Sequence, residues 1–188
     1  MESGFEVFEH GADIGVRGWG FSLEEAFIQG ARAMFSLMTE DLQSVSWETE
    51  IDVQAVGYDL ESLFVAWLNA LLTESDIQRI LLSGFEVSLV PWHISRVAKK
   101  NPPLAPPCRL EDRRQGGESE EERFRADTGQ CSYDSALDQE YTLHGKAKGE
   151  PFSARREEQG VEVKGATFCL AEVSEREGRW VAQCVVDV

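Results

Sequence analysis

The sequence has little of what marks membrane proteins or nucleic-acid-binding proteins. No apolar run approaches the roughly 18 residues that a membrane-crossing helix needs, so no such helix is expected. The N-terminus lacks a basic region followed by an apolar stretch, which makes the cytoplasm the expected location. Lys and Arg number 18 against 34 Asp and Glu, a net charge of −16. This balance excludes high-affinity binding to nucleic acid phosphates through a basic surface.

The chain also lacks the spacing motifs of common catalytic and metal sites. Its four cysteines form no C-x-x-C pair, which excludes a zinc ribbon or a thioredoxin-like motif. Its three histidines are scattered, and neither a P-loop nor a dinucleotide-binding fingerprint is present. No nucleophile, base and orienting group form a recognisable set, so no catalytic residue is expected. Cys169 and Cys184 are expected to be reduced and to face each other across a hairpin that turns at 174–178.

What the chain does contain is a succession of strand and helix patterns. Extended segments are expected at 5–19, 45–55, 85–90, 141–147, 161–173 and 180–186. Helices are expected at 22–38 and 59–75, the first opened by a capping box at Ser22 and Glu25, the second capped by Asp59. The last three extended segments are expected to form an antiparallel meander. These patterns predict an α+β fold with two helices packed on a mainly antiparallel sheet.

The segment 91–139 differs in composition from the rest of the chain. It holds five of the six prolines and the charged run Glu118–Arg123, and few of its positions could pack into a core. The sequence therefore predicts a single domain over 1–188 that carries a mobile insertion at about 91–139.

Carboxylates lie close to both ends of the sequence. Asp13 follows His10 near the start, and Asp187 and Val188 are the last two residues. The ends of a domain often lie near each other, so Asp13, Asp187 and the terminal carboxylate of Val188 could meet. Three such hard oxygen donors suit a divalent cation such as Ca²⁺ or Mg²⁺. The alternatives are that Asp13 caps a turn and that Asp187 is a solvated charge at a strand end.

Short blocks keep their order from one end of the chain to the other. They are FEHGADIG at 8–15, LEEAF at 23–27, AMF at 33–35, MTE at 38–40, DLESL at 59–63, WL at 67–68, VEVKGAT at 161–167 and VVDV at 185–188. In these blocks the chain resembles the archease family, which usually has Thr where this chain has Gly11.

The resemblance implies a protein cofactor that is not itself an enzyme. It would activate an RtcB-type RNA ligase in tRNA splicing and RNA repair by promoting guanylylation and multiple turnover. The implied metal ligands are Asp13, Asp187 and Val188, and Lys164 would contact the partner or a nucleotide. The metal is expected to be Ca²⁺, with Mg²⁺ or Mn²⁺ as alternatives.

Other functions stay open at this point. One is a metal-dependent hydrolase or phosphotransferase that uses the acidic residues itself. Another is a general chaperone, since the archease family has also been viewed as chaperone-like. For Lys164 the alternative role is that of an exposed strand lysine in an ion pair.

Overall fold

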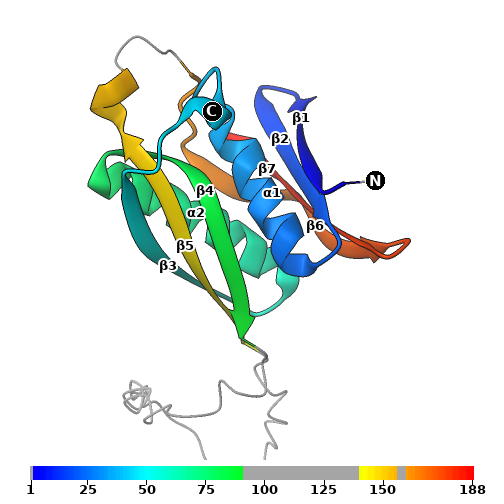
Figure 1. Cartoon of the computed structure of the whole chain (residues 1–188). Helices are drawn as coiled ribbons and strands as arrows, with labels where there is room; N and C mark the ends of the chain where they lie inside the picture. The colour runs from blue at the N-terminus through cyan, green and yellow to red at the C-terminus, as the bar shows by residue number, and fades with distance from the viewer. Residues whose placement is uncertain (1, 91–139, 156–159) are drawn as a thin grey trace, which may run out of the picture. The chain divides into compact units, whose positions relative to one another are not determined.

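The part of the chain that the structure describes is an α+β fold of two antiparallel sheets and two long helices (Figure 1), which confirms the predicted class. The structure is a computed structural model, and it describes residues 2–90, 140–155 and 160–188. Sheet A has the strand order β1 (Gly4–His10), β2 (Asp13–Gly20), β7 (Arg179–Asp187), β6 (Gly165–Arg176). Sheet B has the order β3 (Thr49–Gly57), β5 (Tyr141–Pro151), β4 (Ile80–Val90).

The two helices, α1 (Leu23–Phe35) and α2 (Leu60–Gln78), lie between the sheets. Helix α1 contacts β2 and β7 of sheet A and β4 of sheet B, while α2 contacts β6 of sheet A and β3 of sheet B (Figure 1). Short 3₁₀ turns follow at Leu42–Ser44 and Phe152–Arg155. Among the described residues, neither helix combines the length and apolar character that a membrane crossing requires.

Both helices begin at the caps that the sequence predicts. The Ser22 hydroxyl accepts a hydrogen bond from the Glu25 N–H (3.2 Å), and the Glu25 carboxylate accepts one from the Phe21 N–H (2.7 Å). At α2 the Asp59 carboxylate accepts from the Ser62 N–H (2.7 Å), and the Ser62 hydroxyl accepts from the Asp59 N–H (3.1 Å). Each cap satisfies backbone donors that a helix start leaves without partners, an effect of about 1 kcal/mol.

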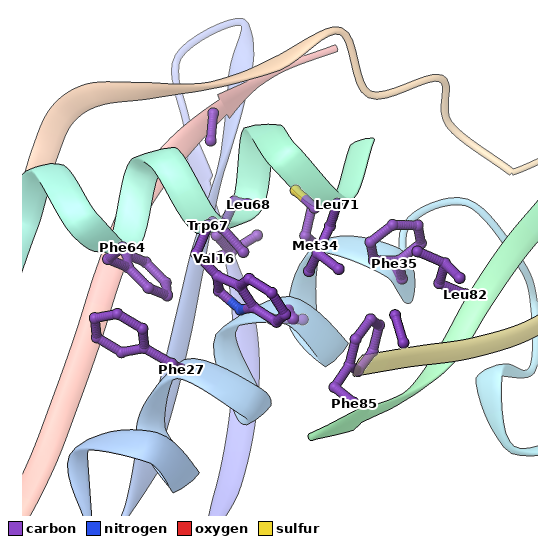
Figure 2. Packing of buried hydrophobic residues seen from close by; sticks show 14 of the residues in the cluster. Val16, Phe27, Met34, Phe35, Phe64, Trp67, Leu68, Leu71, Leu82 and Phe85 are labelled. Atoms are coloured by element: carbon purple, nitrogen blue, oxygen red, sulfur yellow. The ribbon is translucent and has the colours of Figure 1, made fainter. Parts of the chain in front are cut away.

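Aromatic side chains from both helices fill the space between the sheets (Figure 2). The rings of Phe27 and Phe64 lie 5.0 Å apart, centroid to centroid, and join α1 to α2. Trp67 is fully buried and lies against Gly145 of β5, where a Cβ atom would come within 2.5 Å of the indole. The apolar stripe of α2 is therefore core, as its helical periodicity predicts.

The segment 5–19 is extended, as expected, and forms two paired strands because Gly11 adopts φ +66° and reverses the chain. Two other sequence-based expectations about the strands are wrong. The third strand begins at Thr49 rather than at 45, and Trp47 ahead of it is 63% exposed. The C-terminal meander does not form, because β5 pairs with β3 and β4 while β6 and β7 belong to sheet A. Alternating polarity predicts a strand but not its partner.

The predicted insertion at 91–139 lies outside the described residues, but the strands that flank it are neighbours. Val90 of β4 is paired with Thr142 of β5, so a short turn can join the two strands as a hairpin. We expect that replacing 91–139 by a four-residue Gly/Ser linker leaves the fold intact. Urea unfolding would measure this, and a loss above about 3 kcal/mol would show that the segment contributes to the core.

Candidate functional site

Two aspartates from opposite ends of the sequence lie at neighbouring strand ends in sheet A. The antiparallel pairing of β2 with β7 extends to Ile14 and Val186, and Asp13 and Asp187 are the next residue on each strand. Residues opposite each other on adjacent antiparallel strands have Cα atoms about 5 Å apart and side chains on the same face. Asp13 is half-buried and Asp187 is exposed.

Lys164 joins this group through two hydrogen bonds. Its backbone N–H donates to the Asp187 carbonyl (2.9 Å), and its Nζ donates to the Val188 backbone oxygen (2.8 Å). The sequence predicts Lys164 within an extended segment at 161–173, but β6 begins one residue after it, at Gly165. We call Asp13, Lys164, Asp187 and Val188 the strand-end cluster.

The strand-end cluster contains few oxygen atoms that could bind a metal ion. No group of three or more His, Cys, Asp and Glu side chains suited to a metal ion occurs within residues 2–90, 140–155 and 160–188. The cluster has two side-chain carboxylates, from Asp13 and Asp187, so a third donor would have to come from Val188. Its donors are all oxygen, which is the chemistry that Ca²⁺ and Mg²⁺ prefer.

A bulge in β6 adds a feature that sequence reasoning missed. The register with β7 shifts between Thr167 and Glu172, and Leu170 adopts φ +51°. The bulge exposes Cys169, whose Sγ lies 3.5 Å from the His10 Nε2 at the end of β1. Cys184 is a buried residue of β7, and Cys169 lies in the stretch of β6 that has no paired residue on β7. The expectation that Cys169 and Cys184 face each other is therefore wrong. A bulge shifts the pairing of the residues beyond it, and the alternation of apolar and polar residues in β6 does not predict where a bulge occurs.

The two thiols should differ sharply in reactivity. Burial raises the pKa of Cys184 to about 12, so at pH 8 almost none of it is thiolate, the form that alkylating reagents attack. We expect iodoacetamide at pH 8 to modify Cys169 in the folded protein and to leave Cys184 unmodified until the protein is unfolded. Peptide mass mapping would measure both sites, and equal modification of the two in the native state would contradict this.

Asn69 on α2 supports the strand that follows Lys164. Its Nδ2 donates to the Ala166 carbonyl (2.9 Å), and its Oδ1 accepts from the Ala166 N–H (2.9 Å). The amide thus pairs with β6 as a neighbouring strand would, and it fixes the start of β6 against α2. Sequence reasoning missed this role, although an Asn next to the apolar stripe of α2 was a signal.

We expect Asn69→Ala to lower the free energy of unfolding by about 2 kcal/mol, because it leaves both polar groups of the Ala166 backbone without partners. Gln78→Ala, an exposed amide at the end of the same helix, is the matched control and should change stability by less than about 0.5 kcal/mol. Urea unfolding would compare them. Similar losses for the two variants would show that the Asn69 pairing contributes nothing specific.

Fold and site together define a class: an α+β protein with two helices between antiparallel sheets and carboxylates beside a lysine at the strand ends. The model of the Archease protein family (MTH1598/TM1083) matches residues 5–105 and 119–188. The chain therefore belongs to the archease family, as the sequence blocks predict.

Similarity to individual proteins extends over nearly the whole chain. The chain is 30% identical to the protein archease of Pyrococcus furiosus and 29% identical to that of Sulfolobus acidocaldarius, and each alignment covers 98% of both chains. The solution structure of Methanobacterium thermoautotrophicum protein 1598 is matched at 28% identity with a TM-score of 0.65. That match covers 98% of this chain and 99% of the solved one.

Proposed function

We propose that this protein is a metal-binding cofactor of an RtcB-type RNA ligase, which it activates in the cytoplasm by promoting guanylylation and multiple turnover in tRNA splicing and RNA repair. The observation that carries the proposal is the strand-end cluster. Its residues come from β2, from the residue before β6 and from the end of β7, and they are far apart in the sequence. Membership of the archease family supports the same reading.

The donors of the cluster suit a hard cation. Asp13, Asp187 and the carboxylate of Val188 would hold Ca²⁺, with Mg²⁺ and Mn²⁺ as alternatives. A bound divalent ion would supply positive charge that organises phosphate oxygens. The ammonium of Lys164 already contacts a Val188 oxygen at 2.8 Å, so Lys164 both orients that group and adds a compact positive charge beside it.

The charge of the chain suits a ligase as partner. A protein that binds RNA presents Lys and Arg to the phosphates. The net charge of −16 is complementary to such a surface, and it would steer the two proteins together. Because the same charge disfavours RNA binding by this chain alone, the protein would act on the ligase rather than on RNA.

The test is an RNA-joining assay with the cognate ligase limiting, in the presence of GTP, a divalent metal and RNA ends. We expect the protein to raise the product formed per ligase well above one, and to form no product when the ligase is omitted. Unchanged turnover would defeat the proposal. Phosphoester cleavage by the protein alone would favour the hydrolase alternative, and rescue of unrelated aggregating proteins would favour the chaperone alternative.

A further inference from the structure

A cleft of about 560 Å³ lies where α1 is flanked by β1 and β4, the edge strands of the two sheets. It shares no residue with the strand-end cluster. Among the residues that the structure describes, seven line it and none of these is acidic: Phe5, Arg32, Leu42, Gln43, Val45, Trp47 and Ser83. A described lining without a carboxylate is unexpected on a chain with 34 acidic residues. The volume of the cleft is typical of small-molecule sites.

Trp47 forms a fixed aromatic surface in this cleft. Its indole Nε1 donates to the Ser83 hydroxyl (3.0 Å), and the ring lies against Gly84, where a Cβ atom would come within 2.8 Å of it. The Lys148 ammonium lies 5.6 Å from the ring centroid. Even so, the side chain is 63% exposed. The indole is therefore held in place from one side and open on another, as an aromatic recognition surface requires.

Arg32 is the one basic residue among the described residues of the lining. It lies in the last turn of α1, where the helix dipole favours a cation. Among the described residues its guanidinium has no ion pair or hydrogen bond, whereas Arg17 and Arg176 are both paired with glutamates. A free guanidinium in a partly enclosed site is a strong donor for carboxylate or phosphate oxygens.

We propose that this cleft binds a planar aromatic anion, the chemistry that a nucleotide and an aromatic carboxylate share. The ring of the ligand stacks on the open face of Trp47, and Phe5 adds a second apolar contact. The anionic group is held by Arg32, and the Gln43 amide can pair with a polar edge of the ring. This site is independent of the strand-end cluster and of the proposed metal.

The first part of the test is isothermal titration calorimetry on the full chain with four probes: GMP, 1-naphthoate, guanosine and inorganic phosphate. We expect GMP or 1-naphthoate to bind, and guanosine and phosphate to bind at least about tenfold more weakly, because each lacks one of the two contacts. Tighter binding of GMP assigns the site to nucleotides, and tighter binding of 1-naphthoate assigns it to aromatic carboxylates. No binding by either anion at millimolar concentration overturns the proposal.

The second part compares variants that retain the wild-type unfolding midpoint. Arg32→Gln is expected to lower the affinity for whichever of the two anions binds by about tenfold, because it removes a charged hydrogen bond. Arg79→Gln is the matched control, since it removes the same charge from an exposed residue outside the cleft, and it should leave the affinity unchanged. Trp47→Leu is expected to weaken binding by a similar factor. Equal losses for Arg32→Gln and Arg79→Gln, or unchanged affinity for Arg32→Gln, overturn the proposal.

Discussion

Replacing Asp13 and Asp187 together by Asn is expected to lower the stimulation of multiple-turnover ligation by at least about tenfold, because metal affinity depends on the charge of its ligands. Asn keeps the size of Asp and can still accept a hydrogen bond, so the strand ends should stay as they are. Ca²⁺ binding, measured by calorimetry on the chain alone, should fall by a comparable factor. Calorimetry on the chain alone reports metal binding without the ligase, whereas stimulation of ligation also depends on the ligase. Comparing the two measurements therefore distinguishes a loss of metal binding from a loss of binding to the partner.

Asp76→Asn is the matched control for this prediction. Asp76 is an exposed aspartate near the end of α2, with a weak 3.9 Å ion pair to Arg79. The control therefore removes one negative charge away from the cluster, as each of the two substitutions in the cluster does. It should leave both Ca²⁺ binding and stimulation unchanged. If the double variant of Asp13 and Asp187 stimulates the ligase as well as wild type, the strand-end cluster is not the functional site.

Lys164→Gln should also reduce stimulation strongly while leaving the unfolding midpoint near that of wild type, because the side chain is exposed. Lys146→Gln in β5 is the control for this variant. Lys146 is an exposed strand lysine that pairs with Glu50 at 2.6 Å. That change should not affect the ligase. Equal effects of the two variants would mean that the result reflects overall charge rather than position.

The second large effect is expected on stability, from Gly18→Ala in β2. A Cβ atom at Gly18 would lie 2.2 Å from the Gly30 nitrogen and 2.4 Å from the Ala26 carbonyl oxygen of α1. Both are backbone atoms, so α1 would have to move away from sheet A, and the packing of Phe64 against Gly30 would change with it. We expect a loss of about 3 kcal/mol in the free energy of unfolding, measured in urea.

Gly165→Ala is the control for crowding. A Cβ atom there would meet only the Asn69 Oδ1, at 3.5 Å, which is an ordinary contact distance. Its stability should stay within about 1 kcal/mol of wild type. A Gly18→Ala variant that is as stable as Gly165→Ala would show that α1 can shift away from β2 at little cost.

The helices and the acidic ends of the chain could be predicted because their signals are local. The caps at Ser22 and Asp59 depend on residues three positions apart, and the α2 stripe depends on helical periodicity. The position of Trp47 could not be predicted. Val45 and Trp47 continue the spacing of apolar residues at every second position that β3 shows, which predicts a buried Trp47. In the structure, Ser83 and Gly84 of β4 hold the indole outside the core.

The amino-acid sequence by itself determined the α+β class, the places where both helices begin and the presence of carboxylates near both ends. These features follow from propensity, periodicity and capping over a few residues. Only the tertiary structure decided that β5 belongs to sheet B, that Asp13 lies opposite Asp187 and that Lys164 contacts Val188. Strand pairing depends on how both sheets pack on the helices between them, and that packing joins residues more than a hundred positions apart.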